Sequence, residues 1–196
     1  IALVRARCAP EFCAEIGRPR CSCGTWYSDA TYEEALACVN AGADIFVHTY
    51  NGMSGLHHRE PGMVGAAMTT HGTYAEAICD GHHLNPIAVR ALVNAKGYDH
   101  TVLITDCMRA GGMGECESML GEFPVIVKDG TARLKDGGSL AGSILELIQG
   151  VQNVVKWGIA TPHEAITMAS LVPAKSVGID DVADASIQGM QQTSSY

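Results

Sequence analysis

Three short apolar runs, each followed by titratable side chains, constrain most strongly what this chain folds into. Each run is bounded by glycine or proline signals and separated from the next by a helical pattern, which predicts buried strands alternating with helices. The runs are residues 45–47, 75–79 and 101–104. His48 follows the first run, the segment 80–83 follows the second, and Asp106 follows the third. Because catalytic groups of parallel α/β barrels come from the carboxyl ends of several strands, the pattern predicts an enzyme of the α/β class.

Length and composition narrow the classes of protein and partner. The 196 residues suffice for one domain but fall short of the roughly 250 of a complete eight-stranded barrel. With 47% hydrophobic and 17% charged residues, the composition is that of a soluble globular protein. A net charge of -8 argues against nucleic acid as a partner, whereas one local arginine can still bind an anionic small molecule. No membrane span or signal peptide is recognisable, so we expect no membrane partner and a cytoplasmic protein.

Capping signals and amphipathic patterns predict four helices and one hairpin. A Thr-x-x-Glu capping box opens two of the helices, and an Asn-Pro pair opens another. The predicted helices run from Thr31 to Gly42, from Asn85 to Gly97, from about Ser143 to Trp157, and from Thr161 to about Leu171. Two alternating runs within 124–134 flank Asp129-Gly130, which predicts a β-hairpin.

The eight cysteines form no Cys-x-x-Cys pair, so a zinc ribbon or a thioredoxin-type motif is unsupported. Cys38 and Cys79 lie in apolar patterns, and we expect both to be small core residues. The N-terminal cysteines are open to metal binding, to disulfides, or to no special role. They are Cys8, Cys13, Cys21 and Cys23.

Six motifs, in order, resemble those of N-acetylglucosamine-6-phosphate deacetylases, which belong to the amidohydrolase superfamily. The resemblance covers about residues 28–182 and implies the C-terminal half of a metal-dependent-hydrolase (β/α)8 TIM barrel, with most of the accessory β-sandwich missing. Residues 1–27 are then a divergent N-terminal segment and residues 183–196 a divergent tail. The motifs are His-Thr-Tyr-Asn-Gly-Met at 48–53, His-Arg-Glu-Pro-Gly at 58–62, Asp-Gly-His-His at 80–83, Thr-Asp at 105–106, Gly-Ser-Leu-Ala-Gly-Ser at 138–143 and Met-Ala-Ser-Leu-Val-Pro-Ala at 168–174.

The implied reaction is hydrolysis of the acetamide of N-acetylglucosamine 6-phosphate to glucosamine 6-phosphate and acetate. The resemblance makes His48 a ligand of a divalent metal cation such as zinc or iron, which would activate water and polarise the carbonyl. A hydrogen-bonded core histidine is the other interpretation of His48. Asp106, expected to be a buried carboxylate, matches the general base that activates water and then protonates the leaving amine. Its other interpretation is a helix N-cap.

The resemblance also implies residues that bind the amino-sugar phosphate. His83 matches the histidine that helps to polarise the acetamide, while His82 is expected to point away. Asn51 and Gly52 match a loop that meets the substrate, although a glycine there equally marks a turn. Ser139 and Leu140 match the lid over the sugar.

Arg59 matches the arginine that grips the phosphate, a task that suits a bidentate guanidinium. A solvated loop arginine is the alternative, and solvated loop positions are expected for His57 and His58. In several members an arginine like Arg59 comes from the neighbouring subunit, so the resemblance implies a homodimer.

Departures from the family leave three functions open. Gly24-Thr-Trp-Tyr-Ser-Asp-Ala30 stands where the family has Gly-His-Ser-Asp-Ala, so the ligand histidine is missing beside Trp26. The family's glutamate ligand belongs to strands that this sequence lacks. The chain is accordingly a deacetylase by descent, a different amidohydrolase acting on another amide, or a catalytically dead fragment that binds a sugar phosphate.

Overall fold

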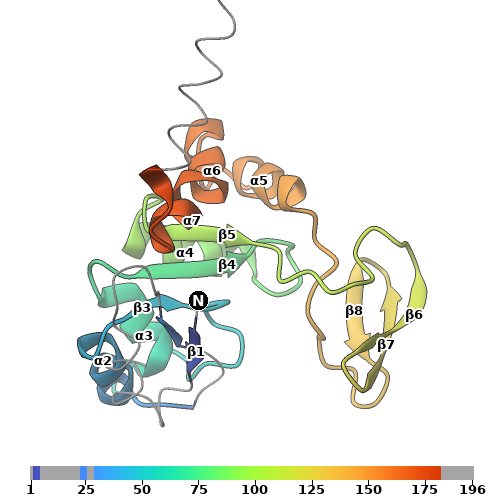
Figure 1. The fold of residues 1–196 in the computed structure, drawn as a ribbon, viewed down its shortest axis with the longest axis horizontal. Helices are drawn as coiled ribbons and strands as arrows, with labels where there is room; N and C mark the ends of the chain where they lie inside the picture. The colour runs from blue at the N-terminus through green and yellow to red at the C-terminus, as the bar shows by residue number, and fades with distance from the viewer. Residues whose placement is uncertain (1, 5–22, 26–28, 182–196) are drawn as a thin grey trace, which may run out of the picture.

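A five-stranded parallel sheet forms the centre of the computed structural model (Figure 1). The structure describes residues 2–4, 23–25 and 29–181, and for the first two ranges it describes the backbone alone. The five strands of the parallel sheet lie side by side in chain order, and every neighbouring pair is parallel. They are β1 (Ala2–Val4), β2 (Cys23–Thr25), β3 (Ala43–Phe46), β4 (Tyr74–Ile78) and β5 (Thr101–Ile104). This arrangement confirms the predicted alternation of strands and helices and the mixed α/β class.

In the part of the chain from β2 to β5, three described helices lie between the strands, and local signals set the ends of two of them. In α2 (Tyr32–Asn40) the capping box is complete, because Thr31 Oγ1 accepts the Glu34 N–H at 3.2 Å and Glu34 Oε2 accepts the Thr31 N–H at 2.8 Å. In α4 (Pro86–Lys96) the Asn85 side chain accepts the Ile87 N–H, and the helix ends at Gly97, where φ is +80°. Between them, α3 (Gly62–Thr69) is buried along most of its length.

Three further helices follow: α5 (Leu147–Lys156), α6 (Pro162–Ala169) and α7 (Leu171–Ser176). The capping box predicted at Thr161 is confirmed, since both of its hydrogen bonds are present. The start of α5 corrects the prediction of a helix from about Ser143. Ser143 instead forms an isolated parallel bridge with Cys107, so its N–H and C=O are bonded to another segment and the helix begins at Leu147.

A second, smaller sheet lies apart from the parallel sheet, to which two extended segments connect it (Figure 1). It consists of β6 (Cys116–Leu120), β7 (Phe123–Lys128) and β8 (Thr131–Leu134), all antiparallel. The predicted β7–β8 hairpin is confirmed, and Asp129 and Gly130 both have the positive φ typical of such a tight turn. Strand β6 was not predicted, and its residues are only partly buried or exposed.

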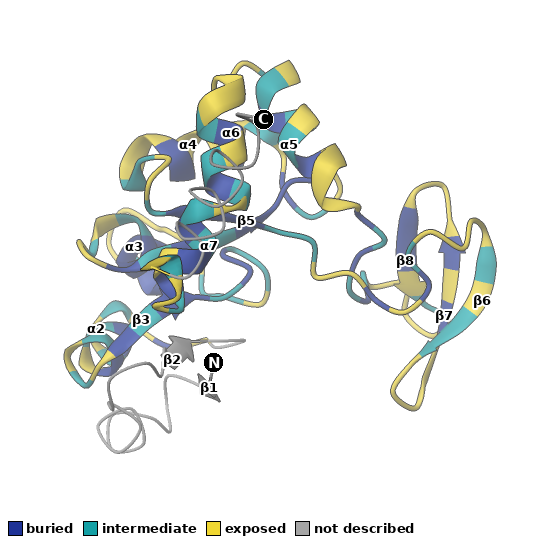
Figure 2. Ribbon diagram, turned by 45° about the horizontal axis from the view of Figure 1, so that its top comes forward, coloured by how far each residue is buried: buried dark blue, intermediate teal, exposed yellow. Residues whose placement is uncertain are grey.

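Buried residues form three clusters that correspond to these parts of the fold, and Figure 2 colours such residues dark blue along the ribbon. One joins α2, β3 and α3, and a second packs α4, α5 and α6 against β4 and β5. The third lies between the small sheet and the segment around Met108. Cys38 and Cys79 are 0% and 1% exposed, which confirms them as core residues. Within the described ranges, no helix has both the length and the apolar character of a membrane span.

Candidate active site at the ends of three parallel strands

A tight turn at residues 48–53 follows β3 and opens the candidate site. His48 is 5% exposed and adopts a φ of +34°, which is uncommon for a residue with a side chain. The Asn51 N–H donates to the His48 carbonyl at 3.0 Å, and Asn51 Nδ2 donates to the same oxygen at 3.1 Å. Gly52 is exposed with a φ of +65°, so a glycine here meets the needs of the turn itself. Asn51 and Gly52 therefore lie in the same turn as His48.

Glu76, in the middle of β4, accepts two hydrogen bonds from this turn. It was not predicted as a site residue. Its Oε2 accepts the His48 N–H at 3.1 Å, and its backbone carbonyl accepts the Thr49 N–H at 2.8 Å. Burial raises the pKa of Glu76, and nearby Asp106 raises it further, against the lowering effect of the His48 hydrogen bond. The sequence signal that could have identified Glu76 is an acidic residue between two alanines in an otherwise uncharged strand.

The segment after β4 pins one histidine with one carboxylate. Asp80 Oδ2 lies 2.6 Å from His83 Nδ1, and Asp80 Oδ1 accepts the N–H groups of His82 and His83 at 2.8 Å each. Burial disfavours ionisation of Asp80, but the bonds from His83 and His82 outweigh it and lower its pKa. The His83 side chain is 7% exposed, whereas His82 is exposed as expected. Because Nδ1 is bonded to Asp80, Nε2 is the ring nitrogen of His83 that remains for another partner.

Asp106 lies just beyond β5 with a φ of +47°. A buried carboxylate was predicted at this position, but Asp106 is exposed at the rim of the sheet. The surrounding protein nevertheless desolvates the carboxyl enough to raise its pKa, while His48 and His83 act in the opposite direction. No helix starts at Asp106, because the next residue, Cys107, bridges to Ser143 instead. The helix N-cap interpretation of Asp106 is thus wrong.

His48, His83 and Asp106, which follow three different strands, interact electrostatically. Burial lowers the pKa of His48, with Asp106 raising it and His83 lowering it further. A lowered pKa favours the neutral imidazole, which is the form that binds metals. The parallel sheet thus brings together His48, His83 and Asp106 from three separate parts of the sequence.

The described residues do not complete a metal site. Between residues 29 and 181, no three His, Cys, Asp or Glu side chains are grouped so that they could hold an ion. A catalytic zinc site has three protein ligands, and here His83 Nδ1 is bonded to Asp80 while Glu76 is bonded to the His48 backbone. Trp26, where the sequence departs from the family's ligand histidine, lies outside the described residues, as do Cys8, Cys13 and Cys21.

The predicted lid residues belong to a loop that extends the small sheet toward the site. Ser139 is exposed and its carbonyl accepts the Leu134 N–H at 2.9 Å, while Leu140 bridges to Arg133. At the end of the loop, the Ser143 N–H donates to the Asp106 carbonyl at 2.8 Å, and the Ser143 hydroxyl donates to the Thr105 carbonyl. Ser143 therefore ties the lid loop to the strand end that carries Asp106.

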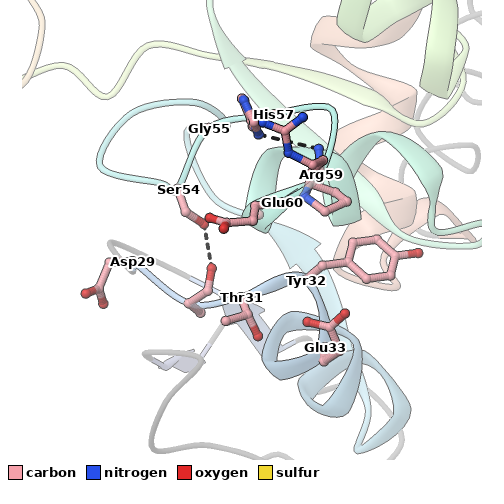
Figure 3. A pocket seen from close by; sticks show the side chains of 12 residues that line it. Asp29, Thr31, Tyr32, Glu33, Ser54, Gly55, His57, Arg59 and Glu60 are labelled. Carbon is pink, nitrogen blue, oxygen red and sulfur yellow. Dashed lines mark hydrogen bonds between the residues drawn. The ribbon is translucent and has the colours of Figure 1, made fainter.

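Arg59 lies elsewhere, in a pocket of about 340 Å³ between the start of α2 and the loop 54–62 (Figure 3). Its N–H donates to His57 Nδ1 at 3.4 Å, and His57 lines the same pocket. Arg59, His57 and His58 are all exposed. None of His48, His83 and Asp106 lines this pocket, so the structure does not bring Arg59 to the candidate site.

Comparison with known proteins points to one family. The N-acetylglucosamine-6-phosphate deacetylase of Vibrio furnissii is 46% identical over 153 residues, which are 78% of this chain and 38% of that protein. The crystal structure of N-acetylglucosamine-6-phosphate deacetylase from Thermotoga maritima superposes with a TM-score of 0.85 at 32% identity, covering 91% of this chain and 49% of that one. The Mycobacterium smegmatis enzyme, solved as a D267A mutant with N-acetyl-D-glucosamine-6-phosphate, gives a TM-score of 0.86 at 26% identity, over 90% of this chain and 48% of that one. No family model matches the chain.

Two further relatives are named for a galactosamine substrate, and the alignment covers most of the length of one of them. The chain spans 38% and 41% of the first curated relatives it matches, the second being the N-acetylgalactosamine-6-phosphate deacetylase of Escherichia coli O157:H7 at 47% identity. A shorter protein of Escherichia coli K12, provisionally described as an N-acetylgalactosamine-6-phosphate deacetylase, is 47% identical over 136 residues, and these make up 69% of this chain and 80% of that protein. The chain therefore belongs to the family of N-acetylglucosamine-6-phosphate and N-acetylgalactosamine-6-phosphate deacetylases.

Proposed function

We propose that the complete protein hydrolyses the acetamide of an N-acetylhexosamine 6-phosphate to the hexosamine 6-phosphate and acetate. Water adds to the acetamide carbonyl, the C–N bond breaks, and the amine leaves with a proton. The observation that carries this proposal is the convergence of His48, His83 and Asp106 at the ends of three consecutive parallel strands. Relatives named for both the gluco and the galacto substrates support the substrate class and leave the sugar open.

Asp106 takes the role of general base and then general acid. It removes the proton from the attacking water and later delivers a proton to the leaving nitrogen. A pKa raised by partial desolvation suits this double task, because a base works best when its pKa approaches the working pH. The positive φ at Asp106 and the Ser143 hydrogen bond to its carbonyl fix the backbone that carries the carboxylate.

His83 orients and polarises the acetamide. The carboxylate of Asp80 holds the ring through Nδ1, so His83 Nε2 faces the substrate without rotational freedom. Asn51 and Gly52 form the floor beside the sugar, and Ser139 and Leu140 lie over it from the lid loop. The hydrogen bond between Ser143 and the Asp106 backbone supports this arrangement, because it links lid and strand end.

We further propose that residues 28–182 are the C-terminal half of a (β/α)8 barrel, of which β3, β4 and β5 are consecutive strands. Residues 1–27 are proposed as a divergent N-terminal segment and residues 183–196 as a divergent tail, with most of the accessory β-sandwich missing. The parallel order of the five strands and the fit to about half of each related structure support this. Both boundaries fall on residues outside the described ranges.

A divalent cation such as zinc or iron is part of the proposal for the complete protein, where it would supply an activated water and a polarised carbonyl. His48 is its proposed ligand here, and other ligands must come from outside the described residues. Arg59 is proposed to grip the phosphate at the site of the other subunit of a homodimer, which its separate pocket supports. We place this reaction in the cytoplasm.

The test is acetate release from N-acetylglucosamine 6-phosphate and N-acetylgalactosamine 6-phosphate, with zinc or cobalt supplied. Asp106→Asn should lower kcat by about 100- to 10,000-fold, the range for a lost general base. Asp129→Asn is the matched control, since it makes the same change on the exposed β7–β8 turn and asparagine tolerates its positive φ. Full activity of the Asp106→Asn protein would refute the proposed role.

The incomplete ligand set favours one second candidate, a sugar-phosphate-binding protein without catalysis. Calorimetric titration with the same two sugar phosphates separates the two. Binding without acetate release, in the presence of metal, would support the binding protein, whereas release of acetate would exclude it. A panel of other amides, including cyclic ones, tests the third possibility of a different amidohydrolase.

A further inference from the structure

Glu76 is a partly buried carboxylate to which the proposed reaction gives no role. Its neighbours Ala75 and Ala77 are both 0% exposed and pack in the cluster formed with α4, α5 and α6. Because successive side chains of a strand point to opposite faces, Glu76 lies on the other face of β4, beside Val102 of β5. A carboxylate removed from water is costly unless it is hydrogen-bonded, so its partners indicate what it does.

Those partners are two consecutive N–H groups of one turn. The side chain of Glu76 accepts the His48 N–H at 3.1 Å, and its backbone carbonyl accepts the Thr49 N–H at 2.8 Å. The ladder between β3 and β4 ends with the pair Phe46 and Ala75, so these two bonds are made just where regular pairing stops. Glu76 thus accepts two hydrogen bonds at the point where the chain leaves the sheet.

The turn that follows is conformationally unusual. His48 and Tyr50 both have positive φ, at +34° and +77°, and neither is a glycine or an asparagine. Such conformations persist only where surrounding contacts over-determine them. Glu76 accepts hydrogen bonds from the N–H groups of His48 and of the next residue, Thr49. Asn51, which belongs to the turn itself, donates to the His48 carbonyl.

We propose that Glu76 is a positioning residue, whose carboxylate fixes the turn at His48 and thereby the placement of the His48 imidazole relative to Asp106. Its influence on catalysis rests on the proposed function, but its control of the turn does not. Acceptance of the His48 N–H needs an oxygen at this place and no charge, so glutamine should serve in place of glutamate.

The experiment measures amide hydrogen exchange and acetate release in Glu76→Ala, Glu76→Met and Glu76→Gln. In the alanine and methionine variants, exchange at the His48 amide should accelerate at least about tenfold, because its acceptor is gone. Glu76→Gln should stay within about threefold of the parent. The His83 amide, which donates to Asp80, is the internal reference and should not change. Glu117→Ala is the matched control, since Glu117 is 75% exposed and pairs only with Lys135 among the described interactions.

In the catalytic arm, kcat should fall at least about tenfold in Glu76→Ala and Glu76→Met and should recover in Glu76→Gln, because misplacement of reacting groups lowers the rate. Unchanged protection of the His48 amide in the alanine and methionine variants would overturn the proposal. Loss of protection in the glutamine variant equal to that in alanine would also overturn it. Glu76→Met keeps the side-chain volume, so it decides the matter if the alanine variant does not fold. A parent protein that releases no acetate refutes the proposed function, while the exchange data still decide the role of Glu76.

Discussion

The parallel sheet and the small antiparallel sheet are held together in different ways. In the parallel sheet, a helix separates each strand from the next from β2 to β5, and the site depends on bonds such as Glu76 to His48 that join distant parts of the sequence. In the β6–β8 sheet, each strand pairs with the next through a short turn. The first sheet has buried clusters along its helices, while much of the second is exposed (Figure 2).

This difference teaches which residues can hold a rigid site. The strand ends of the parallel sheet place His48 and His83 in buried positions with fixed backbones. The loop with Ser139 and Leu140 is exposed and bonded mainly to its own hairpin. We therefore expect changes near the parallel strands to disturb stability and site together, and changes in the small sheet to stay local.

The largest effect is expected from Phe46→Ala in β3. Phe46 is 1% exposed and packs in the cluster with α2 and α3, so its truncation should cost about 3–5 kcal/mol of unfolding free energy. Urea unfolding followed by circular dichroism measures this. A cost below about 1 kcal/mol would mean that the parallel sheet is less tightly packed than the comparison requires.

Asp80→Asn should come next, at about 2 kcal/mol, because it removes the charge that accepts three hydrogen bonds. The folded-state pKa of Asp80 is lowered, so its contribution is complete above the unfolded-state pKa of about 3.9 and is lost as pH falls toward the lower folded-state pKa. The parent should therefore lose more stability than the variant between about pH 5 and pH 2. Parallel pH profiles of the two proteins would contradict this assignment.

Val127→Ala tests the small sheet at a comparably buried position. Val127 is 2% exposed, and removal of two methyl groups should cost about 1.5 kcal/mol. Amide exchange should accelerate in β6–β8 and remain unchanged in β3–β5. Faster exchange in both sheets would show that the two sheets unfold as one cooperative unit. It would contradict the expectation that changes in the small sheet stay local.

Lys135→Ala should have the smallest effect. Lys135 Nζ lies 3.2 Å from Glu117 Oε1, and the two side chains are 49% and 75% exposed. Exposed pairs of this kind contribute little, so the change in unfolding free energy should be below about 0.5 kcal/mol and should shrink in high salt. A clearly larger loss of unfolding free energy would show that the pair of Lys135 and Glu117 stabilises the small sheet.

Some predictions failed where local signals met tertiary contacts. The amphipathic pattern from Ser143 resembles a helix, yet Ser143 pairs with Cys107 because this closes the lid loop onto β5. β6 escaped detection because its alternation is weak and its residues are largely exposed. Glu76 was overlooked as a site residue, since only the folded chain places its carboxylate under His48.

The sequence by itself determined the alternation of β3, β4 and β5 with helices, both capping boxes, the β7–β8 hairpin, the core cysteines and the family. These features depend on hydrogen bonds within a few residues and on apolar periodicity, which a sequence displays directly. Only the tertiary structure decided that Glu76 holds His48, that Asp106 is exposed, and that Arg59 lies in a separate pocket. Contacts between residues far apart in sequence depend on how whole elements pack, and no local pattern encodes that packing.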